Sequence, residues 1–123
     1  MGFAVRVVDR PGALWVSGDT VPTRGVRQVA RRFDVDIALL HLGGVRFPVT
    51  GPVRYSMTGV QAVRLLARLR PRVAVPVHHE GWSHVQEGEE GLRAVLDRAP
   101  AGVRSRVHWL ERGVPWEAGG LVD

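Results

Sequence analysis

Asp19 and four histidines follow short apolar segments of this 123-residue chain, where β-strands would end. Asp19 comes shortly after the run that ends at Val16. His41 closes a long apolar run, and His78 follows the run at residues 73–77. Carboxylate oxygens and neutral imidazoles are suitable ligands for zinc, manganese and iron. The residue types and their positions therefore indicate a candidate metal or catalytic cluster.

Asp19 alone allows two interpretations. It follows Gly18, which lets the backbone turn freely, and its carboxylate can serve as a metal ligand or general base. An aspartate at such a position also starts a turn by accepting hydrogen bonds from its own backbone. From position alone, the turn is the favoured interpretation.

The histidine cluster is more specific. His78, His79 and Glu80 are consecutive, and His84 lies five positions after His79. This spacing is not the helical zinc-protease motif, and a glycine interrupts it. A lone histidine at a strand end is more often structural, but this cluster favours a metal or catalytic role, with His79 and His84 as the catalytic candidates. His41 is predicted to be a core histidine bonded to the backbone.

Composition excludes several classes of protein. The chain has no cysteine, so it has no disulfides, thiolate metal ligands or cysteine nucleophile. It lacks the phosphate-binding loop of nucleotide hydrolases and the serine elbow of α/β-hydrolases. The net charge is +5, yet all 17 basic residues are scattered arginines, so nucleic-acid binding is not expected. No apolar run approaches the ~20 residues of a membrane span, and no signal peptide is visible, so we expect a cytoplasmic protein that does not enter membranes.

Two alternating periodicities predict the elements that position these residues. Strands are expected at 3–9 and 13–17, joined by a type II turn at Pro11 and Gly12, and then at 36–42, 73–77 and 107–110. Helices are expected after the caps Thr23 and Thr58, and again at 92–99. The residues from Gly113 onward are expected to be loosely ordered.

The resulting order, ββαβαβαβ, predicts an α/β fold with helices packed on a mixed sheet. The carboxyl ends of the parallel strands meet at one edge, which would gather Asp19, His41 and His78. Three helices can cover one face of this sheet. The other face therefore requires a partner, either another chain or a missing segment.

The ordered set of motifs resembles the C-terminal half of hydrolases with the metallo-β-lactamase fold, in the branch that includes ascorbate-6-phosphate lactonase. The motifs are residues 17–20 (SGDT), 36–44 (DIALLHLGG), 57–58 (MT) and 75–84 (VPVHHEGWSH). The resemblance implies a four-layer αβ/βα sandwich with a dinuclear metal site. It implies that Asp19 bridges the two metals and that His78 binds the second. Zinc is usual in this family, and manganese or iron occurs in some members.

The resemblance further implies a metal-bound hydroxide that attacks a lactone, ester, amide or phosphodiester in a small-molecule substrate. The family's first ligands, in a His-x-His-x-Asp-His motif, precede the aspartate, whereas only 18 residues without histidine precede Asp19. We therefore expect a single truncated domain, residues 1–123, with an incomplete half-site that binds metal weakly. A homo-oligomer or the missing N-terminal half would cover the sheet. The alternative is a catalytically inactive fragment or a self-associating or partner-binding domain.

Overall fold

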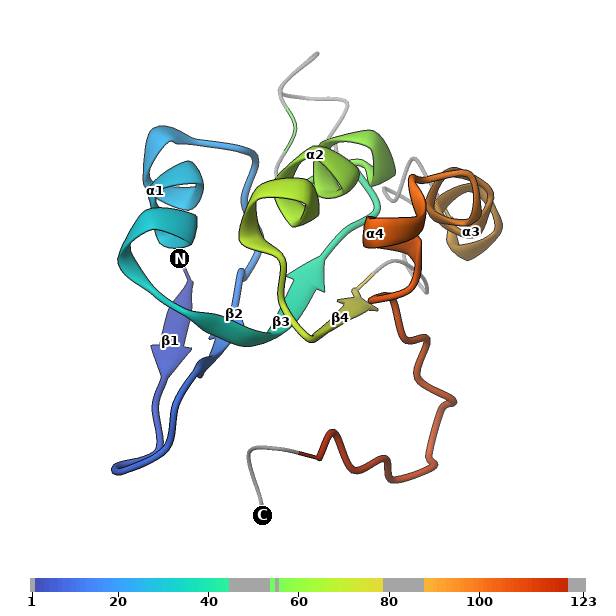
Figure 1. Cartoon of the computed structure of the whole chain (residues 1–123). Coiled ribbons are helices and arrows are strands. Elements are labelled where there is room, and N and C mark those ends of the chain that lie inside the picture. Colours follow the sequence, from blue (N-terminus) through green and yellow to red (C-terminus); the bar gives the residue numbers. More distant parts are fainter. Residues whose placement is uncertain (1, 45–53, 55, 79–87, 120–123) are drawn as a thin grey trace.

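A mixed four-stranded sheet forms the centre of the molecule (Figure 1). The computed structural model describes residues 2–44, 54, 56–78 and 88–119. The strands β1 (Phe3–Val5), β2 (Ala13–Val16), β3 (Val35–His41) and β4 (Val73–Val77) lie side by side in chain order. β1 is antiparallel to β2, and the other neighbours are parallel, which confirms the mixed sheet predicted from the sequence.

In the part of the chain that the structure describes, four helices lie on the same side of this sheet (Figure 1). They are α1 (Arg24–Arg32), α2 (Gly59–Leu69), α3 (Glu89–Asp97) and the short α4 (Ala101–Arg104). Thr23 caps α1 by accepting a hydrogen bond from the amide of Val26, and Thr58 forms a capping box with Gln61. Both predicted caps are therefore confirmed.

Within the described residues, no helix is long and apolar enough to cross a bilayer.

The main core lies between the helices and one face of the sheet. Strand pairing places Trp15, Ala38 and Ala74 in one row across β2, β3 and β4. These side chains are buried in a cluster that includes Leu66 of α2 and Leu92 of α3. Burial of these side chains is the dominant favourable contribution to the stability of the packing between the helices and the sheet. The helical cover is therefore well matched to this face.

The opposite face of the sheet is apolar and only partly covered. Pairing places Val5, Leu14 and Ile37 in one row, and Phe3, Val16, Leu39 and Val75 in the next. Ile37 and Val75 are buried, whereas Phe3 is 59% exposed and Val5 is 54% exposed. We call this surface, from Phe3 and Val5 across to Leu39, the open face. Its β1 side leaves large apolar side chains in water, which is unusual for a sheet surface.

Two local predictions differ from the structure. The hydrogen-bonded turn between β1 and β2 is formed by Val7 and Arg10, with Asp9 in the left-handed region, and not by Pro11 and Gly12. Gly12 does adopt the positive φ, 85°, that a type II turn requires of it, and a Cβ on it would also lie 2.8 Å from Cβ of Asp36. The last predicted strand is reduced to one bridge, between Ala74 and Val107, and α4 was not predicted.

Pro76 shows why β4 can tolerate a proline. The amide of Ala74 points away from β3 and donates to the carbonyl of Arg106. Alternate residues of a strand point their amides to the same side, so the missing N–H of Pro76 also faces away from β3. The ladder between β3 and β4 therefore loses no hydrogen bond. This agrees with the predicted edge position of the proline.

Candidate metal centre

Each parallel strand of the sheet leaves its carboxyl end through a left-handed residue. Gly18 follows β2 with φ 63°, Gly43 and Gly44 follow β3 with φ 109° and 60°, and His78 follows β4 with φ 60°. Glycine adopts this region without cost, but histidine does so rarely. Such outliers gather at functional sites, where the surrounding structure holds them in place. The unusual backbone of His78 therefore marks this edge as a candidate site.

Asp19 and His78 meet at this edge. The Nδ1 atom of His78 lies 2.9 Å from Oδ1 of Asp19, although the two residues follow different strands. The side chain of His78 is 34% exposed and that of Asp19 is 52% exposed, so solvent and small solutes reach the pair. If Nδ1 carries a proton, it donates a hydrogen bond to the carboxylate. If it does not, the lone pair of Nδ1 faces a lone pair of the carboxylate, an arrangement that a cation or a hydrogen-bond donor at this point would stabilise.

His41 lies beside this pair. Its ring centroid is 5.5 Å from that of His78, and the two rings are tilted by 51°. Among the described residues, its buried Nδ1 has no hydrogen-bond partner. Burial lowers the pKa of His41, the carboxylate of Asp19 opposes this shift, and His78 adds to it. The prediction that this ring is bonded to the backbone is wrong for Nδ1, and a neutral imidazole stands next to Asp19 and His78.

Ser17 connects the strand ends that carry the site. Its hydroxyl is buried, accepts a hydrogen bond from the amide of His41 at 2.9 Å and donates one to the carbonyl of Gly18 at 3.0 Å. Its own amide donates to the carbonyl of Leu39. This residue therefore holds the segment of Asp19 against the end of β3. The sequence motif contained Ser17, but nothing in its spacing indicated this role.

The donor set fits part of a divalent-metal site. Two ligand atoms bound at about 2.1 Å in a tetrahedral zinc site lie about 3.4 Å apart, so the 2.9 Å contact between His78 and Asp19 would have to lengthen slightly to admit a metal ion. A catalytic zinc takes three protein ligands as a rule. Within the described residues, no group of three or more histidine, aspartate or glutamate side chains is arranged to hold a metal ion. The described part of the chain therefore provides part of a ligand set.

His79 and His84, the two predicted catalytic residues, lie outside the described residues. On the described side of the site, His78 borders a hollow of about 480 Å³. The other walls of this hollow are Pro76, Val77 and the segment 110–115. Its walls combine apolar side chains, such as Leu110 and Val114, with the charged side chains of Glu111 and Arg112.

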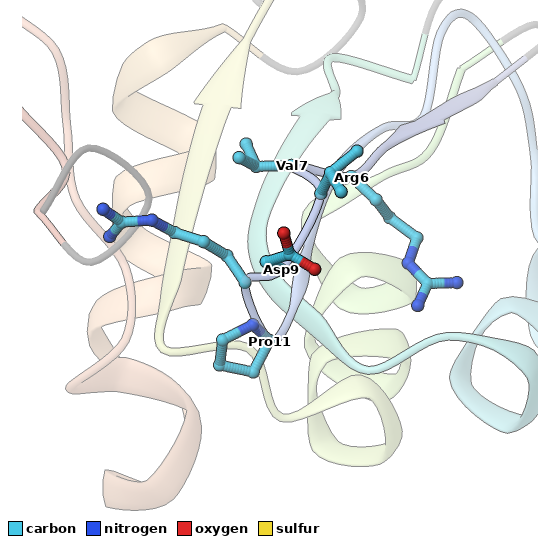
Figure 2. A pocket seen from close by; sticks show the side chains of 6 residues that line it. Arg6, Val7, Asp9 and Pro11 are labelled. Carbon is cyan, nitrogen blue, oxygen red and sulfur yellow. The ribbon is translucent and has the colours of Figure 1, made fainter.

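A larger hollow, of about 600 Å³, lies at the opposite edge of the sheet. Figure 2 shows that Arg6, Val7, Asp9 and Pro11 project from a single stretch of chain there, in different directions. This stretch joins β1 to the amino end of β2, so it lies far along the strand from Asp19. No groups from separate elements converge in this hollow, and it is not the candidate site.

Relatives of the chain are described as metal-dependent hydrolases. A "UPF0173 metal-dependent hydrolase" of Pyrobaculum calidifontis is 27% identical over 112 residues, which cover 91% of this chain and 44% of the relative. Another, from Anaeromyxobacter sp. (strain K), is 31% identical over 116 residues, which cover 94% of this chain and 37% of the relative. The chain thus spans about two fifths of the length of these relatives. No protein-family model matches it.

Solved structures give the same result for the fold. A "possible metal-dependent hydrolase" from Veillonella parvula DSM 2008 superposes with a TM-score of 0.79 and 23% identity. The match covers 93% of this chain and 42% of that structure. Together with the order of the motifs and the mixed sheet, these matches agree with the C-terminal half of the larger fold. Over nearly its whole length, the chain is similar to one half of metal-dependent hydrolases with the metallo-β-lactamase fold.

Proposed function

We propose that this chain supplies part of the metal site of a hydrolase, with Asp19 and His78 as two of the ligands. The observation that carries the proposal is the 2.9 Å approach of Nδ1 of His78 to Oδ1 of Asp19 at the carboxyl edge of the sheet. The names of the relatives support a divalent metal. Oxygen and nitrogen donors suit zinc, with manganese or iron as alternatives.

A divalent metal at this position would lower the pKa of a bound water and polarise the bond to be cleaved. The chain's own residues prepare the position for it. Asp19 supplies negative charge, and His78 supplies a nitrogen whose direction is set by its left-handed backbone. Ser17 holds the segment that leads to Asp19 against the end of β3, so this ligand needs little rearrangement. We propose a small-molecule ester, lactone, amide or phosphodiester as substrate, with His79 and His84 as catalytic residues.

We propose that further ligands come from a second polypeptide, and the uncovered apolar surface of the open face supports this position for it. The metal-dependent hydrolases that match this chain are more than twice as long as the segment that matches. We propose that a polypeptide equivalent to their unmatched part packs its own sheet on the open face. Two apolar sheet faces packed in this way form a common two-layer core. The completed edge would then carry ligands from both parts.

Metal titration tests the site in the chain itself. We expect zinc to bind weakly, with one ion or fewer per chain, and Asp19→Asn and His78→Asn each to weaken binding at least about tenfold. Asp34→Asn and His108→Asn serve as matched controls away from the edge. Tight binding of two zinc ions per chain would contradict the half-site. Unchanged affinity in both site variants would contradict the assignment of the ligands.

Sequencing of the DNA on the 5′ side of the Met1 codon tests the partner. An in-frame or adjacent coding segment with the His-x-His-x-Asp-His pattern would support a hydrolase completed by a second part. Co-expression of that segment should then yield a complex with hydrolytic activity. A chain that binds no such segment, but forms stable homo-oligomers through the open face, would instead support a self-associating domain.

A further inference from the structure

Helices α1 and α2 form a surface of one charge. α1 carries four arginines and α2 carries two, and neither helix contains an aspartate or glutamate. The whole stretches 20–33 and 37–79 lack acidic residues. The neighbouring α3 differs, because it carries Glu89, Glu90 and Asp97. The positive charge of the helical layer is therefore concentrated on α1 and α2.

A groove runs between these two helices. Its volume is about 450 Å³, and it is the most enclosed of the hollows described for this chain. Arg27 of α1 lines it from one side, and Arg64 and Arg68 of α2 line it from the other. Val21 and Leu65 contribute apolar wall. We call this hollow the α1–α2 groove.

The three groove arginines have no acidic partner in the described part of the chain. Among the residues that the structure describes, none of Arg27, Arg64 and Arg68 forms an ion pair or side-chain hydrogen bond. Arg64 and Arg68 are four positions apart on one helix face, an arrangement of like charges that destabilises a helix. In α3, by contrast, Arg93 is paired with Glu89 four positions earlier, at 2.8 Å. The groove thus concentrates positive charge that nothing in the described fold neutralises.

The geometry points to a binding site in the α1–α2 groove for a ligand that carries a short chain of phosphate groups. Arginine forms two parallel hydrogen bonds to a phosphate, and three guanidinium groups from two helices can surround several phosphate oxygens. The apolar wall at Leu65 would contact an organic group attached to the chain. This site does not depend on Asp19, His78 or a metal.

The charge pattern favours a compact ligand over a long nucleic acid. α3 packs against α2, and its carboxylates lie on the far side of α2 from α1. A polyanion that continued across the helical layer would meet these negative charges. Among the side chains that line the groove, the charged ones are all arginines, so a ligand confined to it would meet no negative charge. The inference is therefore a phosphate chain, either inorganic or attached to a nucleoside.

Calorimetric titration of the full chain with tripolyphosphate and with ATP, at one ionic strength, tests the site. We expect Arg64→Gln/Arg68→Gln to weaken binding at least about tenfold. The charge-matched control Arg6→Gln/Arg98→Gln changes exposed arginines outside the groove and should lower affinity less than about threefold. Tighter ATP binding than tripolyphosphate binding would identify a nucleotide as the ligand, and the reverse order an inorganic chain.

Three results would overturn the inference. The first is no measurable binding of either probe to the unmodified chain. The second is an equal loss of affinity in the groove variant and its control, because binding would then follow net charge alone. The third is a single-stranded RNA that binds more tightly than both probes, with equal sensitivity to the two double variants. Circular dichroism of each variant confirms that the comparison is made between folded chains.

Discussion

The buried hydroxyl of Ser17 accepts a hydrogen bond from the backbone amide of His41 across the gap between β2 and β3. The two residues stand where both strands reach the edge that carries Asp19 and His78. The same hydroxyl donates to the carbonyl of Gly18, just before Asp19. One side chain thus links the turn that presents Asp19 to the strand that presents His41. The hydrogen bonds of Ser17 therefore help to set the position of Asp19.

Ser17→Ala should destabilise the fold and loosen the site together. The amide of His41 would lose its acceptor in a buried position, which costs about 1–3 kcal/mol. Chemical denaturation measures this loss. Ser105→Ala, at an exposed position, is the control and should stay within about 0.5 kcal/mol of the unmodified chain. A stability for Ser17→Ala equal to that of the control would show that water replaces the hydroxyl.

Substitutions of His78 should separate its backbone role from its chemical role. His78→Gly should be more stable than His78→Ala by about 1 kcal/mol, because glycine adopts the left-handed region and alanine does not. Both variants should lose the same metal affinity. At Val77, in the extended strand, the order should invert, with alanine more stable than glycine. Equal stabilities at position 78 would mean that the turn relaxes out of the left-handed region.

Arg72 attaches the C-terminal segment to the sheet. Its guanidinium donates to both carboxylate oxygens of Asp36 at 2.9 Å, and to the carbonyls of Ala118 and Gly119 at 2.7 Å. Arg72→Met should lower the free energy of unfolding by about 1 kcal/mol, since the pair is partly exposed. Amide hydrogen exchange at residues 110–119 should accelerate. Arg70→Met is the control, and unchanged exchange in Arg72→Met would contradict the attachment.

The open face should promote association when nothing covers it. Phe3 and Val5 expose large apolar side chains, and burial of one such side chain stabilises by about 1.5–3 kcal/mol. Phe3→Ser/Val5→Thr should therefore weaken any self-association at least about tenfold in sedimentation velocity. Val60→Thr removes a similarly exposed apolar group from α2 and should have little effect. A monomer that stays monomeric at high concentration would argue against association through this face.

The sequence predicted most of the fold because its periodicities are strong. The apolar stripes of α1 and α2, with the caps Thr23 and Thr58, define those helices within a few residues. The position of the hairpin turn was harder to predict. Asp9 and Gly12 both turn the chain, and only the tertiary contact of Gly12 with Asp36 distinguishes their roles. The strand predicted at residues 107–110 was wrong. Only Val107 pairs with the sheet there, through a single bridge, so no alternating pattern supports a strand.

The site was predictable in its location but not in its support. Topology alone brings Asp19, His41 and His78 to one edge, since parallel strands share their carboxyl ends. The contact between Asp19 and His78 is consistent with their predicted roles, which zinc titration would test. Neither the buried Nδ1 of His41 nor the hydrogen bonds of Ser17 leave a signature in residue spacing. Both arise from how two strand ends meet, which is a three-dimensional property.

The strands of the sheet lie in the order in which the chain is made, and this has a consequence for synthesis. Each strand pairs with the strand that precedes it in the chain, so no strand depends on a partner that is synthesised much later. As the chain leaves the ribosome, β1 can pair with β2, and then β3 and β4 can be added in turn. The growing edge is always the newest strand. Such a sheet is suited to form progressively from β1 towards β4 during translation.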